Sequence, residues 1–135
     1  MVATLELEDA KDRSAGFSVD DLKWSNGVAP WFGQVRAAIL ACSDDIVELP
    51  RAKSVVYRAP EWFVEVIPRT KGFLLRLAAD TSDLENLSPD VQEAAAWSFI
   101  TRSSVFGGSL FTVSTADQLA TACGLIGRTY QLMFE

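Results

Sequence analysis

The basic side chains of this 135-residue chain are concentrated in one short segment. Six of its 12 Lys and Arg residues lie between residues 51 and 76, where Glu61 and Glu65 are the only acids. The rest of the chain is acidic, and the net charge is −6. Guanidinium groups bind carboxylate or phosphate, and a neighbouring aromatic ring adds stacking. The candidate binding residues are therefore Arg58, Trp62, Arg69, Lys71 and Arg76.

Two interpretations of this segment are open. If Arg58, Glu65 and Arg76 share one face of a sheet, cross-strand ion pairs neutralise that face and it has no further role. Alternatively, the segment binds an anion, an acidic protein segment or nucleic acid, with Arg69 and Lys71 projecting from a hairpin. Nucleic-acid binding would be weak and salt-dependent, because the flanking acids oppose long contacts.

Most catalytic chemistries lack their residues here. The chain has no histidine, which excludes Ser-His-Asp and Cys-His nucleophilic sites and the common catalytic zinc sites. Two separated cysteines, Cys42 and Cys123, cannot form a four-cysteine zinc site and are expected to be small buried hydrophobic residues. We expect no metal and no cofactor. Catalysis by carboxylates stays open as the least favoured function, with these candidates: Asp44, Asp45, Asp80, Asp83, Glu85, Asp90 and Glu93.

The favoured function is a non-enzymatic binding or accessory module that engages a protein partner or a second copy of itself. Four tryptophans support this interpretation, because tryptophan is enriched at interfaces. No apolar run approaches the roughly 20 residues of a membrane helix, and the acidic N-terminus does not resemble a secretory signal. We therefore expect a cytoplasmic protein without a membrane partner.

These residues must be positioned by a small number of elements. Pro30 opens a helix near residues 31–43, and residues 46–50 form a linker. Strands are predicted at 54–58, 62–67 and 73–77, with a five-residue hairpin connection at 68–72 that has glycine where φ is positive. On the middle strand, Trp62, Val64 and Val66 are expected on one face and Phe63 and Ile67 on the other.

An acidic connection at 80–87 precedes a helix that begins at Ser88-Pro89-Asp90 and continues to about Phe99. A strand at 110–113 leads to the last helix, which begins at Ser114-Thr115 in capping-box register with Asp117 and Gln118. The order is α-β-β-β-α-β-α. It predicts an α+β fold with a mostly antiparallel sheet of about four strands, as a polar arm (1–23) and one domain (24–135).

A scattered set of residues resembles a family of small bacterial domains of unknown function, whose members often carry the label of predicted transport proteins. The resemblance covers roughly residues 20–132. It rests on Trp31, Ile39, Tyr57-Arg58, Phe63-x-x-Val66-x-Pro68-x-x-Lys71-Gly72-x-Leu74-x-x-Leu77, Asp83-Leu84, Asp90-Val91, Ser114, Asp117-x-Leu119, Ile126 and Tyr130.

This resemblance implies a fold and no reaction. The family's His-Trp-Gly-x-Gly motif is missing, and Trp97 and Gly107-Gly108 are its only remnants, so nothing about that motif is carried over.

Overall fold

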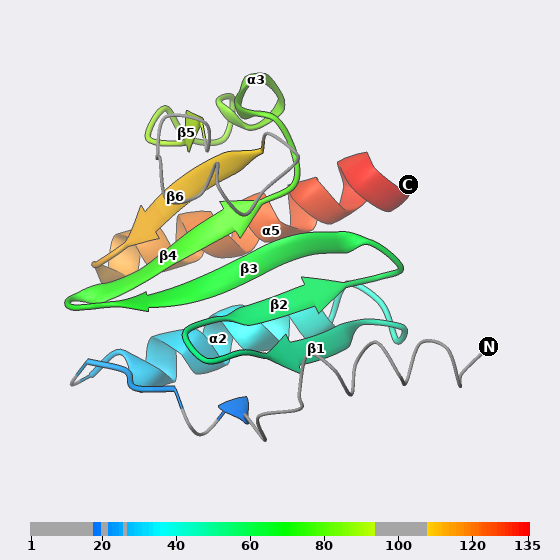
Figure 1. Ribbon diagram of the computed structural model, residues 1–135. Coiled ribbons are helices and arrows are strands. Elements are labelled where there is room, and N and C mark those ends of the chain that lie inside the picture. Colours follow the sequence, from blue (N-terminus) through cyan, green and yellow to red (C-terminus); the bar gives the residue numbers. More distant parts are fainter. Residues whose placement is uncertain (1–17, 20–21, 26, 94–107) are drawn as a thin grey trace.

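The structure, a computed structural model, describes residues 18–19, 22–25, 27–93 and 108–135. Within these residues one sheet has six strands in the order β1-β2-β3-β4-β6-β5, and every neighbouring pair is antiparallel (Figure 1). The strands are β1 (Val47–Pro50), β2 (Val55–Arg58), β3 (Trp62–Arg69), β4 (Gly72–Leu77), β5 (Gln92–Glu93) and β6 (Ser109–Val113). The antiparallel α+β fold is confirmed, whereas the prediction of about four strands is wrong.

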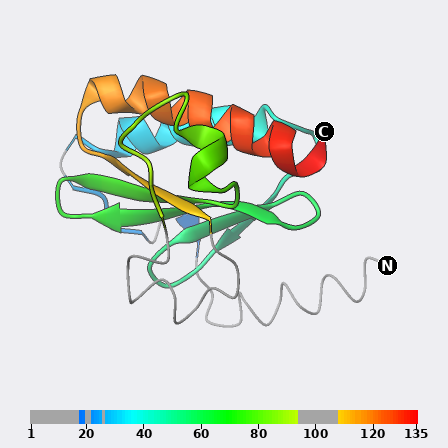
Figure 2. The ribbon, with the colours of Figure 1, turned by 90° about the horizontal axis from the view of Figure 1, so that it is seen from above.

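Two helices, α2 (Ala29–Leu40) and α5 (Ala116–Phe134), cover one face of this sheet. Figure 2 shows both on the same side of the strands, and in Figure 1 they run in the same direction. A short helix, α3 (Thr81–Leu84), follows β4. The described residues thus form two layers, with strands on one side and helices on the other.

Local sequence explains where both long helices begin. Proline lies in the first turn of α2, where its missing N–H removes no helical hydrogen bond. At the start of α5 the Thr115 hydroxyl accepts a hydrogen bond from the backbone N–H of Gln118, whose side chain accepts one from the Thr115 N–H. The predicted capping box is confirmed for this pair.

The core lies between the two layers and is strongly aromatic. The Phe63 ring centroid lies 5.6 Å from that of Tyr130 and 5.7 Å from that of Phe134, both on α5. Before α2, the Trp24 ring stacks on Phe32 with a centroid distance of 4.3 Å. Leu22 is also buried in the core. Val19 and Leu22, which belong to the predicted N-terminal arm (1–23), therefore pack on the domain.

A β-bulge corrects the predicted faces of the middle strand. Arg58 pairs with Trp62 and Tyr57 pairs with Val64, so Phe63 is an extra residue between the two pairs. The extra residue breaks strict alternation. Phe63, Val64 and Val66 consequently all join the helix-side core, while Ile67 packs in a separate cluster with Leu74 and Leu110.

Three other predicted elements differ from the structure. Residues 47–50 are strand β1, not a linker, because Pro50 at its end pairs with Val55 without interrupting the ladder. Residues 81–84 form α3 within the predicted acidic connection. Gln92 and Glu93 form β5 against β6, where a helix was predicted. The rest of the predicted helix, residues 94–99 with Trp97, lies outside the described residues, and so does Gly107.

The β3–β4 turn is tighter than predicted, and its glycine has another purpose. Arg69 pairs with Gly72, so Thr70 and Lys71 alone connect the strands. Among described residues, positive φ occurs at Gly27 and Gly108 and not at Gly72. A Cβ atom on Gly72 would lie only 1.9 Å from the carbonyl oxygen of Val113 on the neighbouring strand. Close approach of two backbones therefore requires glycine there.

Candidate functional site: the front face of the sheet

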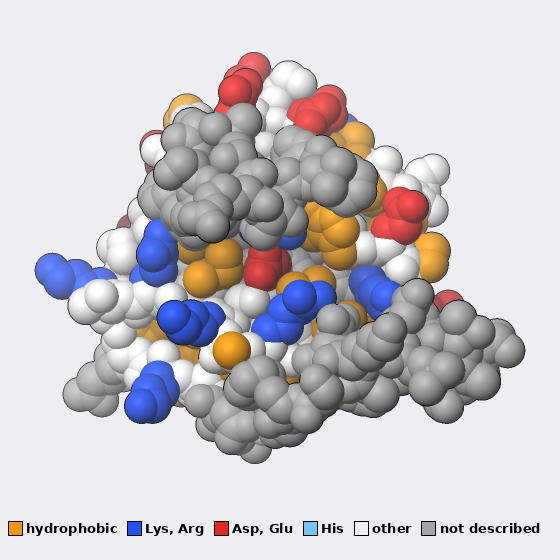
Figure 3. Space-filling view, in the orientation of Figure 1, with side chains coloured by type: hydrophobic (Ala, Val, Ile, Leu, Met, Phe, Trp, Pro, Cys, Tyr) orange, Lys and Arg blue, Asp and Glu red, His pale blue; other side chains and the backbone are white. Residues whose placement is uncertain are grey.

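The sheet face opposite α2 and α5 carries most of the candidate residues, and we call it the front face. The strand register places these side chains on it: Leu49, Val56, Arg58, Trp62, Glu65, Ile67, Leu74, Arg76 and Leu110. Figure 3 views this face and shows Lys and Arg side chains around exposed hydrophobic groups, with an acidic group near the centre. Apolar and cationic groups are therefore interleaved.

Arg76 is buried on this face and holds Trp62 in place. Arg76 is 8% exposed, and its guanidinium carbon lies 4.4 Å from the centroid of the Trp62 ring. Its Nε lies 3.2 Å from Oε1 of Glu65, but it makes no hydrogen bond to the residues that the structure describes, so the contact is an ion pair without hydrogen-bond geometry. The Ser54 hydroxyl donates to the other oxygen, Oε2 of Glu65, at 2.7 Å.

The contacts that link Ser54, Glu65, Arg76 and Trp62 indicate the role of Arg76. Removing one partner of a buried ion pair leaves an uncompensated charge, which typically costs about 3–5 kcal/mol. The guanidinium also gains from lying over the electron-rich face of the indole ring. Arg76 is therefore a positioning residue for Trp62, and Arg58, Glu65 and Arg76 do share one face.

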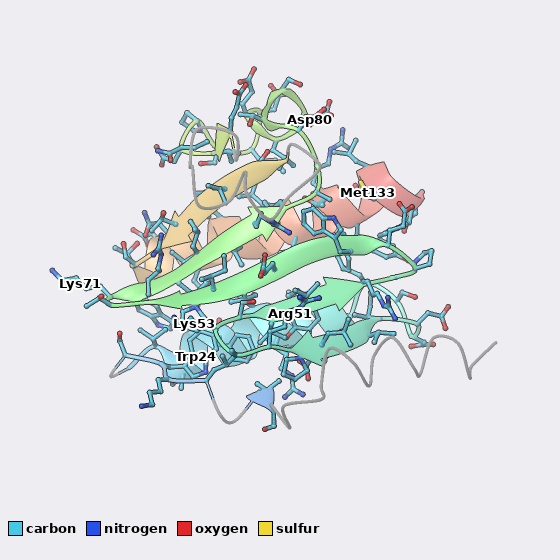
Figure 4. The ribbon with its side chains drawn as sticks, in the orientation of Figure 1. Trp24, Arg51, Lys53, Lys71, Asp80 and Met133 are labelled. Carbon is cyan, nitrogen blue, oxygen red and sulfur yellow. The ribbon has the colours of Figure 1, made fainter. Side chains whose placement is uncertain are left out.

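A cavity of about 450 Å³ opens beside Trp62. Leu49 and Val56, which are 3% and 8% exposed, are its apolar strand residues. Two cations, Arg51 and Arg58, and one acid, Glu61, also line it. The remaining described residues of its lining are Pro60, Trp62, Ala78 and Met133. Figure 4 labels Arg51 in front of the sheet and Met133 near the end of α5.

Arg69 and Lys71 lie elsewhere, at the β3–β4 turn. Arg69 lies seven positions after Trp62 on β3, about 23 Å along a strand. At this end a hollow of about 430 Å³ is lined by Lys23, Trp24, Ser25, Pro68, Arg69 and Thr70. The Ser25 hydroxyl donates to the backbone oxygens of Arg69 and Thr70, which attaches the N-terminal segment to the turn. Figure 4 shows Lys71 at the tip.

The structure thus divides the five predicted binding residues into two groups. It brings together Arg58, Trp62 and Arg76, and it leaves Arg69 and Lys71 at the far end of the same strand. Sequence reasoning missed Leu49, because residues 46–50 were predicted to be a linker, and Lys23, because it lies in a weakly patterned segment. It also missed Met133, for which no local signal exists.

A second polar group lies on the helix side of the sheet. Arg36 on α2 donates from Nε and an Nη to the two carboxylate oxygens of Glu48, at 2.7 and 2.9 Å. The Tyr57 hydroxyl donates to Glu48 Oε2 at 2.7 Å. Burial and then the Glu48 carboxylate raise the pKa of Tyr57 well above its ordinary value. The group therefore joins α2 to β1 and β2 as a structural link.

The cysteines and acids form no reactive cluster among the described residues. Cys42 and Cys123 are free and half-buried, and burial raises the pKa of both thiols, which disfavours the nucleophilic thiolate. The described lining of the cavity includes none of the candidate catalytic acids, and Glu61 is its one acid. In the part of the chain that the structure describes, no three metal-ligating side chains come together and no helix is long and apolar enough to span a membrane.

Comparison of the chain with protein-family models, with curated proteins and with solved structures gives no match. The resemblance to the small bacterial domain family therefore stays a prediction from the sequence. The function is therefore inferred from the geometry of the front face.

Proposed function

We propose that this protein is a non-enzymatic binding module that engages a protein partner through the front face of its sheet. The observation that carries this proposal is the cavity beside Trp62, in which apolar strand residues and two arginines line one concave surface. Tryptophan and arginine are the residue types that most often dominate the energy of protein interfaces. A sheet face whose charged side chains only neutralise one another needs no such cavity.

The arrangement of Trp62 supports the same function. Its ring is fixed against Arg76 before any partner arrives, so binding does not have to immobilise that side chain. Ordering a mobile side chain at an interface costs about 0.5–1.5 kcal/mol, and a fixed one avoids this cost. Glu65 on β3 and Ser54, which directly precedes β2, extend this support.

Site-specific photo-cross-linking in the source organism tests this proposal. A benzoylphenylalanine is introduced at Glu61 or at Thr112, which are exposed residues by the cavity and on the sheet, or at Gln34 or Ala120, which are exposed on the helices. We expect adducts from the first pair and none from the second. We further expect the adduct at position 61 to disappear in the double variant Arg51→Ala/Arg58→Ala.

The mass of the adduct distinguishes a second copy of this chain from a different protein, and either satisfies the proposal. Adducts that arise solely from the helix positions, or an adduct at position 61 that survives removal of both arginines, would overturn it. Urea unfolding of each variant confirms that the fold is retained.

One observation favours a second candidate function, anion or nucleic-acid binding at the β3–β4 turn. Lys23 and Arg69 line the same hollow, and Lys71 lies on the adjoining one. A salt titration with single-stranded DNA or RNA tests it. Binding at about 50 mM salt that weakens as salt rises, and that is lost in Arg69→Ala/Lys71→Ala, is the expected result. Absence of binding at that salt concentration excludes the nucleic-acid version.

A further inference from the structure

We propose that the cavity beside Trp62 takes one large apolar side chain from an acidic linear segment of the protein partner, while carboxylates of that segment face Arg51 and Arg58. This inference rests on the proposed function and names the chemistry that the front face recognises. It follows from four properties of the cavity: its apolar residues, its fixed aromatic wall, its charge and its exposed rim.

The apolar residues of the cavity are suited to one bulky side chain. Leu49 and Val56 come from adjacent strands and pair directly with each other. Met133 contributes from the end of α5, and Pro60 from the β2–β3 turn. A volume of about 450 Å³ has room for one large side chain. Burying one large apolar side chain contributes about 1.5–3 kcal/mol.

Trp62 forms the aromatic wall of the cavity, and Arg76 supports its ring. Arg76 occupies one face of the Trp62 ring, and Glu65 compensates its charge. Trp62 itself is only partly buried and lines the cavity. A ring that is fixed on one face and accessible from the cavity is a preformed contact for an inserted side chain.

The charge around the cavity selects an acidic segment. Arg51 and Arg58 face one acid, Glu61, and exposed Lys53 lies in the same β1–β2 turn as Arg51. Both arginines also contact other groups, so the inference rests on their position and charge. The whole chain carries a net charge of −6, so much of its surface repels an acidic segment, whereas Arg51 and Arg58 attract one.

The exposed rim favours a segment of a larger partner over a free small molecule. Arg51, Pro60 and Glu61 line the cavity and are all exposed. Sites for free small ligands usually bury about 70–90% of the ligand surface, which requires deeper enclosure. A peptide segment gains additional contacts along the front face and does not depend on enclosure.

The test uses three synthetic peptides and a site-specific reporter. The first peptide has one phenylalanine flanked by two aspartates on each side; in the second, alanine replaces the phenylalanine; in the third, lysines replace the aspartates. The protein is labelled with 5-fluorotryptophan, and the Trp62 resonance is assigned with Trp62→Phe. We expect the first peptide to shift the Trp62 resonance and to leave those of Trp24 and Trp31 unchanged.

Affinity should depend on both chemical features. We expect each control peptide to bind about tenfold more weakly or worse, which corresponds to about 1.4 kcal/mol. The double variant Arg51→Ala/Arg58→Ala should lose a similar factor. The matched variant Arg128→Glu makes the same change in net charge at an exposed position of α5 outside the described cavity lining, and it should stay within about twofold. Glu61→Lys, which removes the one acid of the described lining and adds a cation at this exposed position, should bind the first peptide more tightly.

Several outcomes would overturn the inference. Equal binding of the alanine peptide would show attraction by charge alone, and an unchanged Trp62 resonance would place the contact elsewhere. Free 3-phenylpropionate that binds as tightly as the first peptide would make the cavity a small-molecule site. If the peptides fail while front-face cross-links persist, this inference alone fails. If those cross-links are missing as well, the proposed function fails with it.

Discussion

Tyr57 shows how one buried hydroxyl links stability to pH. The residue is 0% exposed, and its hydroxyl donates to the Glu48 carboxylate that Arg36 also binds. A hydrogen bond to a charged group typically contributes about 1.5–3 kcal/mol. Because burial raises the pKa of Tyr57 in the folded protein, its stabilising effect is fully present below the pKa of an unfolded tyrosine, about 10, and is lost above it.

Tyr57→Phe should therefore destabilise the protein by about 2 kcal/mol at neutral pH. Above about pH 10 the wild type should lose stability relative to the variant by up to about 1.4 kcal/mol per pH unit, so that the difference closes. Urea unfolding between about pH 7 and pH 11 measures this. The raised thiol pKa values of Cys42 and Cys123 act equally in both proteins and cancel. A difference that is constant with pH would contradict the burial of this hydroxyl.

Arg76 illustrates how the same residue type can have different roles on one face. The sequence placed Arg58 and Arg76 together as candidate binding cations. In the structure Arg76 is buried between Glu65 and Trp62, whereas Arg58 lines the cavity. Depth of burial, which periodicity does not reveal for a two-sided strand, separates Arg76, which supports Trp62, from Arg58, which we propose contacts the partner.

At the level of elements, the close packing of β4 against β6 depends on a glycine. Gly72→Ala would place a Cβ atom 1.9 Å from the Val113 carbonyl oxygen, which belongs to the backbone of the neighbouring strand. The strands must separate to accept it, so we expect a loss of about 3 kcal/mol in the free energy of unfolding. Urea denaturation measures the change.

Gly124→Ala is the matched control for this substitution. A Cβ atom at this exposed position of α5 would meet nothing within 4 Å, and alanine favours the helix by about 0.5–1 kcal/mol. The control should therefore be neutral or stabilising. Equal destabilisation by both substitutions would show that the close strand contact is not the cause.

At the level of the whole molecule, the relative direction of the two helices separates the cysteines. Helices α2 and α5 run in the same direction (Figure 1), so the end of α2 lies near the end of α5. Burial, and then the Glu135 carboxylate, raise the pKa of Cys42, which follows α2. Cys123 lies 12 residues before Glu135, about 18 Å along a helix. A disulfide requires Cα atoms within about 7 Å of each other.

We expect mild oxidation of the folded protein to form no intramolecular Cys42–Cys123 bridge. The protein is treated with diamide at low protein concentration and then alkylated in denaturant. Mass spectrometry should find no monomer in which both cysteines resist alkylation. A bridged monomer would be recognised because a reductant restores the alkylation of both cysteines. The same treatment in about 6 M guanidinium is the control, because an unfolded chain can bring the two thiols together. A bridge in the folded protein would contradict the parallel arrangement of the helices.

The sequence determined those features that depend on neighbouring residues. The first turn of α2 at Pro30, the capping box at Thr115 and Gln118, and the apolar strands of the meander are local, and each was predicted close to its observed position. The charge segregation is also a property of the sequence alone. It identified Arg58 and Trp62 as binding candidates, which the front face then brought together beside a cavity.

Tertiary structure decided everything that depends on partners distant in the chain. β1 and β5 are short edge strands whose ladders come from β2 and β6, so their own residues do not reveal them. The bulge at Phe63 exchanged the predicted faces of Trp62 and Phe63, because β3 has one more residue than β2 in this stretch. Leu49 and Met133 meet at one cavity although 84 positions separate them, and only the packing of α5 against the sheet brings them there.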